Sequence, residues 1–590
     1  MFKDLRDYYW KHRWWLYMSI VFLIIATGLG VAYPILLGNL IDDINMGRFD
    51  RVIELSLLVV SFITLKAAFQ YGHGFTGTRF GNTIAYNMRN TLYKKLQQLS
   101  FQYYDRAKTG DLMSRLTADL DGIRGFMAFG FAQFLNVFVM VAVGMITMGI
   151  INWKLMLISL IPMPLLALRA LQFERHVHPA FRAIRVSMGK LNTAAQENIT
   201  GMRAVKSFAN EPFEVDKFVS VNEDYQDKNV HASKIWAKFF PVMEFLANTS
   251  IVILIAAGGL FVIYDVISIG ELVSFSSLIW YIIGPMWGLG FHINMYTQAK
   301  ASVERIKEIT DHPVHIKGIE GAKHLDRDEF KGEVEFKNVT FHYPDNPPAL
   351  KDISFHAYPG KIIGILGGTG AGKSTLVQLL MRAYDIQSGQ ILFDGHDIRT
   401  LTPESVRKQI GFVFQETFLF SSTIRNNIAY GRDEATMEDV IEAAKLACAH
   451  DFIMELPEGY DTIVGERGLG LSGGQKQRLA IARALVFDPK IIVFDDSTSA
   501  VDMKTEHEIQ RALQNAMKGR TTFIIAHRIS SLKHADEILI LDRGEIVQRG
   551  THEELIQVPG YYRDTYDIQF GDLPEEIRYK VQARGGAVNE

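Results

Sequence analysis

The stretch IIGILGGTGAGKSTLVQLL, residues Ile362–Leu380, decides the fold of the carboxy-terminal half of the chain. It begins with a short apolar strand, Ile362–Leu366, passes through a glycine-rich turn and ends in an amphipathic helix. The turn, Gly367–Ser374, fits the pattern G-x-x-x-x-G-K-[ST] in the strand–turn–helix context that this motif requires. Glycines let backbone N–H groups surround phosphate oxygens, and the positive end of the helix dipole favours them further. The pattern predicts an α/β P-loop domain that binds a nucleoside triphosphate.

Two side chains of this loop have predicted roles of their own. Lys373 is expected to reach the β- and γ-phosphates, and the hydroxyl of Ser374 is expected to hold Mg²⁺. The other predicted phosphate contacts in this stretch are Gly367, Gly368, Thr369, Gly370, Ala371, Gly372 and Thr375.

Three further features fit the same site. A second apolar strand, Ile491–Phe494, ends on Asp495, a carboxylate that in a P-loop enzyme supports the magnesium ion, usually through water. Tyr343 precedes the phosphate loop, where an aromatic ring can stack on a nucleobase or simply pack on the surface. The segment LSGGQ, Leu471–Gln475, places a serine and two glycines before a helix, which predicts a second anion-binding helix start.

The amino-terminal half instead carries long apolar segments. A helix that crosses a bilayer needs about 20 mostly apolar residues. We expect six spans, of which the fourth is weak because its apolar core is short and contains two prolines. The expected spans are about 15–40, 55–77, 126–151, 154–172, 239–264 and 271–293.

Charge predicts the orientation of these spans. Basic residues precede the first span, whereas the first loop is rich in aspartate, so the amino terminus is expected in the cytoplasm. An even number of spans places the carboxy-terminal half there too, at the cell membrane. The long loops 78–125 and 173–238 keep helical periodicity, which predicts cytoplasmic extensions of the spanning helices. We expect their tips near Gly110–Asp119 and Ser207–Asp216.

Composition limits the classes of partner and the covalent links that the chain can have. The 590 residues carry a net charge of −3, which gives no support to nucleic-acid binding, and the single cysteine, Cys448, excludes a disulfide within the chain. The main ionisable residues inside the expected spans are Lys66 and Glu244, with His73 and His292 near span ends. Lys66 and Glu244 are each a candidate for contact with a transported compound, or else face the protein interior or a span end.

Taken together, these motifs resemble those of an ATP-binding cassette (ABC) exporter half-transporter over nearly the whole chain. YYDRAKTGDLMSRLTADL and ENITGMRAVKSFANE resemble the intracellular loops of such exporters, and the tips of these loops resemble their coupling helices. The motifs in family order are the phosphate loop, FVFQE with Gln415, VGERG at Val464–Gly468, LSGGQ, IIVFDD at Ile491–Asp496, SAVD at Ser499–Asp502 and AHR around His527.

The resemblance implies ATP and Mg²⁺ as cofactors and adds roles to particular residues. Tyr343 would stack on adenine, Gln415 would join Ser374 and Asp495 around Mg²⁺, and His527 would contact the γ-phosphate. The signature residues would contact ATP held by a partner subunit, which implies a dimer with two composite sites. Those residues are Ser472, Gly473, Gly474 and Gln475.

One residue departs from the family pattern. After the strand-ending aspartate the family has a glutamate that acts as general base or positions the attacking water, but this chain has Asp496. The ordinary pKa values of the two acids differ by only about 0.4. Their reach differs by one methylene, on the order of 1.3 Å, and a misplacement of about 1 Å can lower a rate about 100-fold. We therefore predict slow hydrolysis at this site, unless a small backbone shift lets Asp496 substitute adequately.

The preferred hypothesis is that the chain is half of a heterodimer that exports hydrophobic or amphipathic compounds, multidrug type, through the membrane. Its own phosphate loop would form a degenerate site, and its intact signature would complete a competent site on the partner. The alternatives are a homodimeric lipid flippase and a membrane-tethered regulatory ATPase that transports nothing. The expected parts are a transmembrane domain at 1–305, a linker at 306–331, a nucleotide-binding domain at 332–568 and a polar tail at 569–590.

Overall fold

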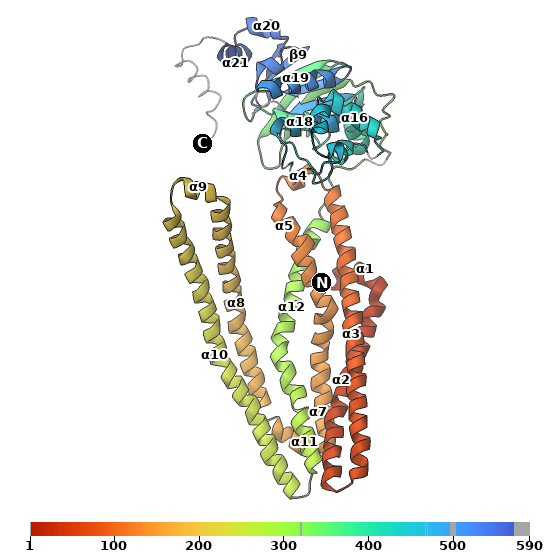
Figure 1. Ribbon diagram of the computed structural model, residues 1–590, viewed down its shortest axis with the longest axis vertical. Helices are drawn as coiled ribbons and strands as arrows, with labels where there is room; N and C mark the ends of the chain where they lie inside the picture. Colours follow the sequence, from red (N-terminus) through yellow and green to blue (C-terminus); the bar gives the residue numbers. More distant parts are fainter. Residues whose placement is uncertain are drawn as a thin grey trace. The chain divides into compact units, whose positions relative to one another are not determined.

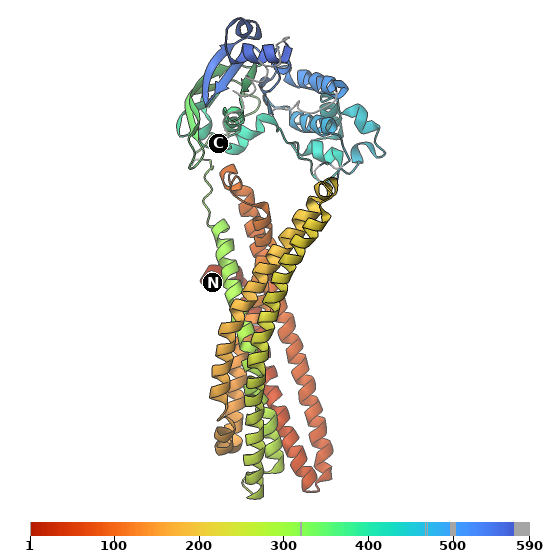
Figure 2. The same cartoon turned by 90° about the vertical axis from the view of Figure 1, so that its left-hand side faces the viewer.

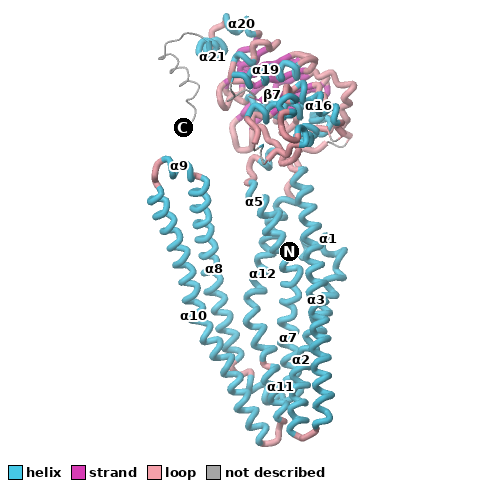
Figure 3. The backbone as a smooth tube through the Cα atoms, viewed as in Figure 1, coloured by secondary structure: helices cyan, strands magenta, loops and turns pink. Residues whose placement is uncertain are grey.

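The computed structural model describes residues 2–318, 321–432, 434–465, 468, 470–495 and 503–570. The chain forms two compact units. The helical unit comprises residues 1–97 and 108–312, and the sheet unit comprises residues 98–107 and 313–590. Figure 3 shows long helices in the first and a mixture of strands and helices in the second.

Long helices joined by short turns build the helical unit (Figure 1). Two π-helical turns, η2 and η3, interrupt the third long helix near its start. In chain order the elements are α1 (Phe2–Tyr9), η1 (Trp10–His12), α2 (Arg13–Asn45), α3 (Phe49–Gln98), α5 (Thr109–Ser114), η2 (Arg115–Asp119), α6 (Leu120–Gly125), η3 (Phe126–Gly130), α7 (Phe131–Ser159), α8 (Met163–Thr200), α9 (Met202–Ser207), α10 (Glu211–Ile263), α11 (Ile269–Leu278) and α12 (Trp280–Thr310).

In the described part of the chain, five helices are long and apolar enough to cross a membrane. Four of the six expected spans lie within them, a fifth, 239–264, runs one residue past Ile263, and the fourth expected span, 154–172, does not lie within one. The five helices cover Lys3–Asn45, Phe49–Gln98, Thr109–Ser159, Glu211–Ile263 and Ile269–Thr310.

The backbone explains why the fourth expected span is weak. Asn152 leaves the helical conformation, with φ −158° and ψ 104°, and its side-chain oxygen accepts hydrogen bonds from the N–H groups of Lys154 and Leu155, both at 3.1 Å. A second break follows at residues 160–162, just before α8 begins at Met163. The segment 154–172 is therefore a short helical piece, a turn and the start of α8.

The loop tips differ from the sequence-based expectation. The helix that starts at Phe49 ends at Gln98, and Ser100 and Lys108 are extended, so the first tip carries the short helix α4 (Phe101–Tyr104). The expected tip at 110–119 is wrong, because α5 and η2 continue helically there. The second tip carries α9 and a turn at 208–210, so the expected stretch 207–216 contains this turn, while its part from Glu211 onward belongs to α10. Figures 1 and 2 show α8 and α10 side by side below this tip.

Two glycines allow α2 and α11 to pack very closely. A Cβ on Gly270 would lie 2.0 Å from the backbone oxygen of Gly38, and a Cβ on Gly38 would lie 2.4 Å from the oxygen of Gly270. The Ser274 hydroxyl donates to the Pro34 oxygen at 2.9 Å, and the N–H of Gly270 donates to Oδ1 of Asp42 at 2.8 Å. Hydrogen bonds across a backbone-to-backbone contact therefore hold these two helices.

The sheet unit contains two sheets. The smaller one is antiparallel, in the order β2-β1-β4-β5. The larger one has the order β10-β9-β3-β8-β7-β6 and is parallel except for the pair β10 and β9. The strands are β1 (Val334–His342), β2 (Pro348–Ala357), β3 (Ile362–Gly367), β4 (Ser388–Phe393), β5 (His396–Asp397), β6 (Ile410–Val413), β7 (Ile491–Asp495), β8 (Thr521–Ile525), β9 (Glu537–Asp542) and β10 (Glu545–Gly550).

The sheet unit also contains helices after its first loop tip. They are α13 (Lys373–Leu380), η4 (Ile398–Thr400), α14 (Pro403–Lys408), α15 (Ile424–Ala429), α16 (Met437–Leu446), α17 (His450–Met454), η5 (Gly459–Asp461), α18 (Gly473–Leu485), α19 (Met503–Met517), η7 (Ile529–Ser531), α20 (His552–Gln557) and α21 (Tyr561–Phe570). The last helix includes residues 569 and 570, which the sequence analysis assigned to the tail, and α12 continues to Thr310, beyond the expected domain end at 305.

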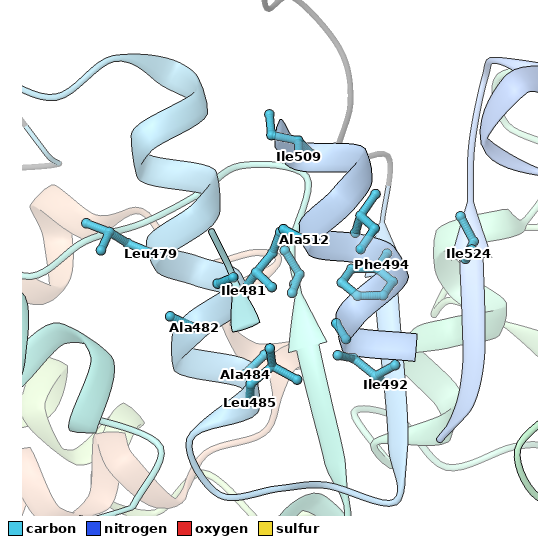
Figure 4. Close-up of a cluster of buried hydrophobic side chains, with 14 of the residues drawn as sticks. Leu479, Ile481, Ala482, Ala484, Leu485, Ile492, Phe494, Ile509, Ala512 and Ile524 are labelled. Carbon is cyan, nitrogen blue, oxygen red and sulfur yellow. The ribbon is translucent and has the colours of Figure 1, made fainter. Parts of the chain in front are cut away.

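The buried core fixes the strand that carries Asp495. Ile492 and Phe494 of β7 face Ile481 of α18 and Ala512 of α19 in one apolar cluster (Figure 4). Strands β6 and β8 pair with β7 on its two sides. The position of Asp495 is thus set by packing on the strand faces and by hydrogen bonds on both edges.

Candidate nucleotide site

One edge of the larger sheet collects the predicted site residues. Strands β3, β8, β7 and β6 are consecutive and parallel, so their carboxyl ends lie on the same edge. The phosphate loop follows β3 and His527 follows β8, while Asp495 ends β7 and Gln415 follows β6. Segments up to about 160 residues apart in the chain are therefore brought together.

The phosphate loop requires glycine at particular positions. Gly370 and Gly372 have φ values of +78° and +99°, which side-chain-bearing residues rarely adopt. A Cβ on Gly372 would also lie 2.6 Å from the backbone oxygen of Ala349. Gly372 is the residue before α13, so this glycine turn leads directly into the start of that helix.

Lys373 is folded into the loop. Its side chain is almost entirely buried, with 7% of the residue exposed, and Nζ donates to the backbone oxygens of Gly367 at 3.0 Å and Gly368 at 2.8 Å. These carbonyls offset the cost of burying the ammonium group. The positive charge of Lys373 is thereby held against the backbone of the phosphate loop.

Ser374, in the first turn of α13 after β3, lies next to Asp495 at the end of β7. The Ser374 hydroxyl donates to Oδ1 of Asp495 at 3.3 Å, and Asp495 is 6% exposed. A hydroxyl and a carboxylate are oxygen ligands of the kind Mg²⁺ prefers, so the residues present fit that ion. Gln415 is exposed beyond the end of β6, where a third oxygen ligand could be added.

Tyr343 directly follows β1 and is half-buried. Its hydroxyl is 3.1 Å from Oγ1 of Thr375, and its ring packs edge-on against Phe341 at 4.9 Å and Tyr384 at 5.3 Å. Burial raises the pKa of Tyr343, so its hydroxyl stays protonated near neutral pH. The ring is thus held beside the phosphate-loop helix, which carries Thr375.

The aromatic cluster also includes the first loop tip, a connection that the sequence analysis missed. Tyr384 donates to Oδ2 of Asp105 at 2.9 Å, and its ring centre lies 6.3 Å from that of Phe101. Arg106 donates to Asp345 at 2.8 Å, an exposed pair that adds little. Residues 98–107 therefore belong to the sheet unit through specific contacts. The aromatic-rich segment FQYYDR was the available signal.

The loop that carries His527 is held by a residue with no local sequence signal. The Gln569 side chain donates through Nε2 to the backbone oxygen of His527 at 2.8 Å and accepts through Oε1 from the N–H of Ile529 at 2.9 Å. The His527 side chain itself is exposed. Gln569 is the penultimate residue of α21.

The signature segment forms the start of α18. Ser472 caps the helix, and its Oγ accepts from the N–H of Gln475 at 3.3 Å. In return Oε1 of Gln475 accepts from the N–H of Ser472 at 2.9 Å, which completes a capping box. Gly473 has open space around it, whereas Gly474 is buried. Part of the motif thus has a structural role in shaping the helix start.

Some predicted residues lie outside the described part of the chain. They include Asp496, the SAVD segment at 499–502, and two residues of VGERG, at 466 and 467. Of the charged residues in the expected spans, Glu244 is exposed on α10. Lys66 reaches toward α2, since a Cβ on Gly30 would lie 3.3 Å from its Nζ.

Comparison with known families gives matches in both halves. Residues 16–286 match the family described as ABC transporter transmembrane region. Residues 350–499 match the family described as ABC transporter.

Whole proteins match over nearly their full lengths. The ABC transporter ATP-binding protein YknU of Bacillus subtilis is 49% identical, covering 97% of this chain and 98% of its own length. The ATP-dependent lipid A-core flippase of Syntrophus aciditrophicus is 36% identical, covering 95% and 93%. The multidrug resistance-like ATP-binding protein MdlA of Escherichia coli is 34% identical, covering 98% and 99%. A solved structure of a bacterial Atm1-family ABC exporter with ATP bound has a TM-score of 0.79 and 27% identity, covering 95% of this chain and 99% of that one.

Proposed function

The chain belongs to the ABC transporter family as a multi-span membrane protein of exporter type, and from this premise we propose that it exports hydrophobic or amphipathic compounds as one half of a heterodimer. Its ATPase domain hydrolyses ATP to drive transport, and ABC exporters act as dimers. The proposal concerns the finer points: the partner, the degenerate site and the transported class. We also propose that the sheet unit lies in the cytoplasm, at the cell membrane.

The sheet edge supports the proposed roles of the site residues. Lys373 would exchange the loop carbonyls for β- and γ-phosphate oxygens, and Ser374, Asp495 and Gln415 would hold Mg²⁺, which supplies charge neutralisation at the phosphates when bound. His527 would contact the γ-phosphate, and Tyr343 would offer its ring to adenine. Such an edge provides the groups needed to bind ATP.

The observation that carries the heterodimer is Asp496, next to an otherwise complete set of groups. The fixed position of β7 adds to this argument. Asp495 is paired with Ile525 of β8, and the residues before it are fully buried, so shifting the strand end to extend a shorter acid would disturb the core. The carboxylate of Asp496 would then stay one methylene short of the attacking water.

The intact LSGGQ signature is what this chain would contribute to the ATP site of a partner. The capping box fixes the helix start that would face ATP on a partner, so a chain with a slow site of its own could still complete a fast site elsewhere. Asp496 in one half and a glutamate in the other is therefore the arrangement we propose.

The test is ATP turnover with and without the partner. We expect little ATPase activity from the chain purified alone, and substrate-stimulated activity when it is copurified with a second half-transporter that carries the glutamate. Matched preparations with Lys373→Ala in this chain and in the partner's equivalent loop would show which site turns over. Strong turnover by two identical copies, abolished by Asp496→Asn, would overturn the heterodimer.

The second candidate, a homodimeric lipid flippase, is favoured by the likeness to the lipid A-core flippase. Proteoliposomes separate these possibilities. Export of an amphipathic dye supports the proposal, whereas ATP-dependent transfer of a labelled phospholipid by the chain alone supports the flippase. ATP turnover with neither movement would indicate a regulatory ATPase.

A further inference from the structure

The loop after β8 contains residues 527–529, of which His527 and Arg528 are exposed and Ile529 is buried. The core holds one side of this loop, since Ile529 and Leu532 are fully buried. From α19, Nε2 of Gln510 donates to the Ser531 hydroxyl at 3.3 Å. These contacts anchor the loop on the side beyond His527.

The Gln569 side chain bonds to the backbone at both ends of residues 527–529. Its amide donates to the His527 oxygen and accepts from the Ile529 N–H, which is the pairing that a neighbouring strand would make. Two bonds from one planar group fix both the position and the orientation of this backbone segment. A fixed backbone at His527 in turn restricts the directions in which the imidazole can point.

The helix that carries Gln569 is itself firmly seated. Tyr562 of α21 is fully buried, and its hydroxyl lies 2.6 Å from Nδ1 of His552 in α20. Tyr566 packs against the same apolar core that supports β7. The amide at position 569 is thus delivered from a rigid platform near the end of the described chain.

We infer that Gln569 is a positioning residue for His527, so that the carboxy-terminal helix α21 sets how well this site distinguishes ATP from ADP. The inference rests on the proposed contact of His527 with the γ-phosphate. Holding the backbone in place keeps the imidazole aimed at the terminal phosphoryl group, which ADP lacks. The binding of the α- and β-phosphates, by contrast, depends on the phosphate loop.

The experiment measures Mg²⁺-ATP and Mg²⁺-ADP affinities of the full-length chain in detergent by calorimetric titration. The reference variant is His527→Ala, which we expect to weaken ATP binding about tenfold, the effect of losing one hydrogen bond to a charged group. Gln569→Ala should weaken ATP binding about threefold or more, with ADP binding unchanged. Gln569→Glu should resemble it, because a carboxylate cannot donate to the His527 oxygen.

Controls keep the outcome decisive. Gln557→Ala, an exposed glutamine at the end of α20, should change neither affinity. A Gln569 variant that weakens ATP and ADP equally would show a purely structural role and overturn the inference. ATP binding that falls in His527→Ala but not in the Gln569 variants would overturn it while sparing the proposed function. If His527→Ala itself leaves ATP binding unchanged, the proposed role of His527 fails and the inference fails with it.

Discussion

Apolar side chains face opposite ways in the two units. In the sheet unit they are buried, as Phe494 is in β7 at 0% exposure. In the helical unit many face outward, such as Ile150 at 80% and Phe245 at 69%. A unit that leaves its apolar side chains outside is built for an apolar solvent, whereas the sheet unit is built around a core and carries its chemistry on a polar edge. One chain thus follows two rules of burial, and substitutions should have different consequences in each.

The largest effect should come from removing the buried ammonium of the phosphate loop. Lys373→Ala should lower ATP affinity about 100-fold, because a charged donor to the phosphates is lost. The measurement is ATP binding by the purified chain. Lys408→Ala, at an exposed lysine paired with Glu404, is the matched control and should bind normally. Equal affinity in the two variants would contradict the predicted role of Lys373.

The next largest effect should come from lengthening the acid that follows Asp495. In the complex with the partner, and with the partner's own phosphate loop disabled, Asp496→Glu should raise ATP hydrolysis by up to about 100-fold, because the longer acid restores the reach to the attacking water. The control lengthens the neighbouring acid instead: Asp495→Glu should lower hydrolysis, because Asp495 already meets Ser374 at 3.3 Å. An unchanged rate in Asp496→Glu would show that the shorter acid suffices.

A smaller effect is expected in the helical unit, and it should be on stability. Gly270→Ala places a methyl group 2.0 Å from the Gly38 oxygen, which should cost roughly 1–3 kcal/mol as α2 and α11 are forced apart. Gly259→Ala is the control, since its Cβ would meet nothing within 4 Å. Thermal unfolding in detergent should be lowered by Gly270→Ala alone. Similar melting of both variants would indicate that this helix contact is loose.

The smallest effect concerns residues 98–107. Tyr384→Phe removes the bond to Asp105, worth about 1 kcal/mol, so hydrogen exchange of this segment should accelerate about fivefold. Tyr358→Phe, at an exposed tyrosine, should leave it unchanged. Burial, and then the Asp105 hydrogen bond, raise the pKa of Tyr384. Its hydroxyl therefore stabilises the contact fully below the ordinary tyrosine pKa of about 10, and the effect should persist from neutral to mildly alkaline pH.

What the sequence predicts well is chemistry written in a short stretch. The phosphate loop and the strand ending on Asp495 each lie within a few consecutive residues, and the parallel sheet places both on one edge. The apolar helices were located for a similar reason, because about 20 apolar residues in a row are a local signal.

What the sequence predicts poorly depends on distant contacts or on where a helix breaks. Periodicity continues through 100–119, so it could not show that extended residues at Ser100 and Lys108 bracket the first tip. The bond from Gln569 to the His527 oxygen joins residues 42 apart, and no spacing rule predicts it. Asp496 is known from the sequence alone, since it lies outside the described residues.

The assignment of residues 98–107 to the sheet unit means that the chain passes between the two units three times, after residues 97, 107 and 312. A soluble fragment expressed from the linker onward would therefore lack a piece of its own fold, and Tyr384 would lose its Asp105 partner. Conversely, a protease that cut only the linker would leave residues 98–107, which belong to the sheet unit, on the amino-terminal fragment.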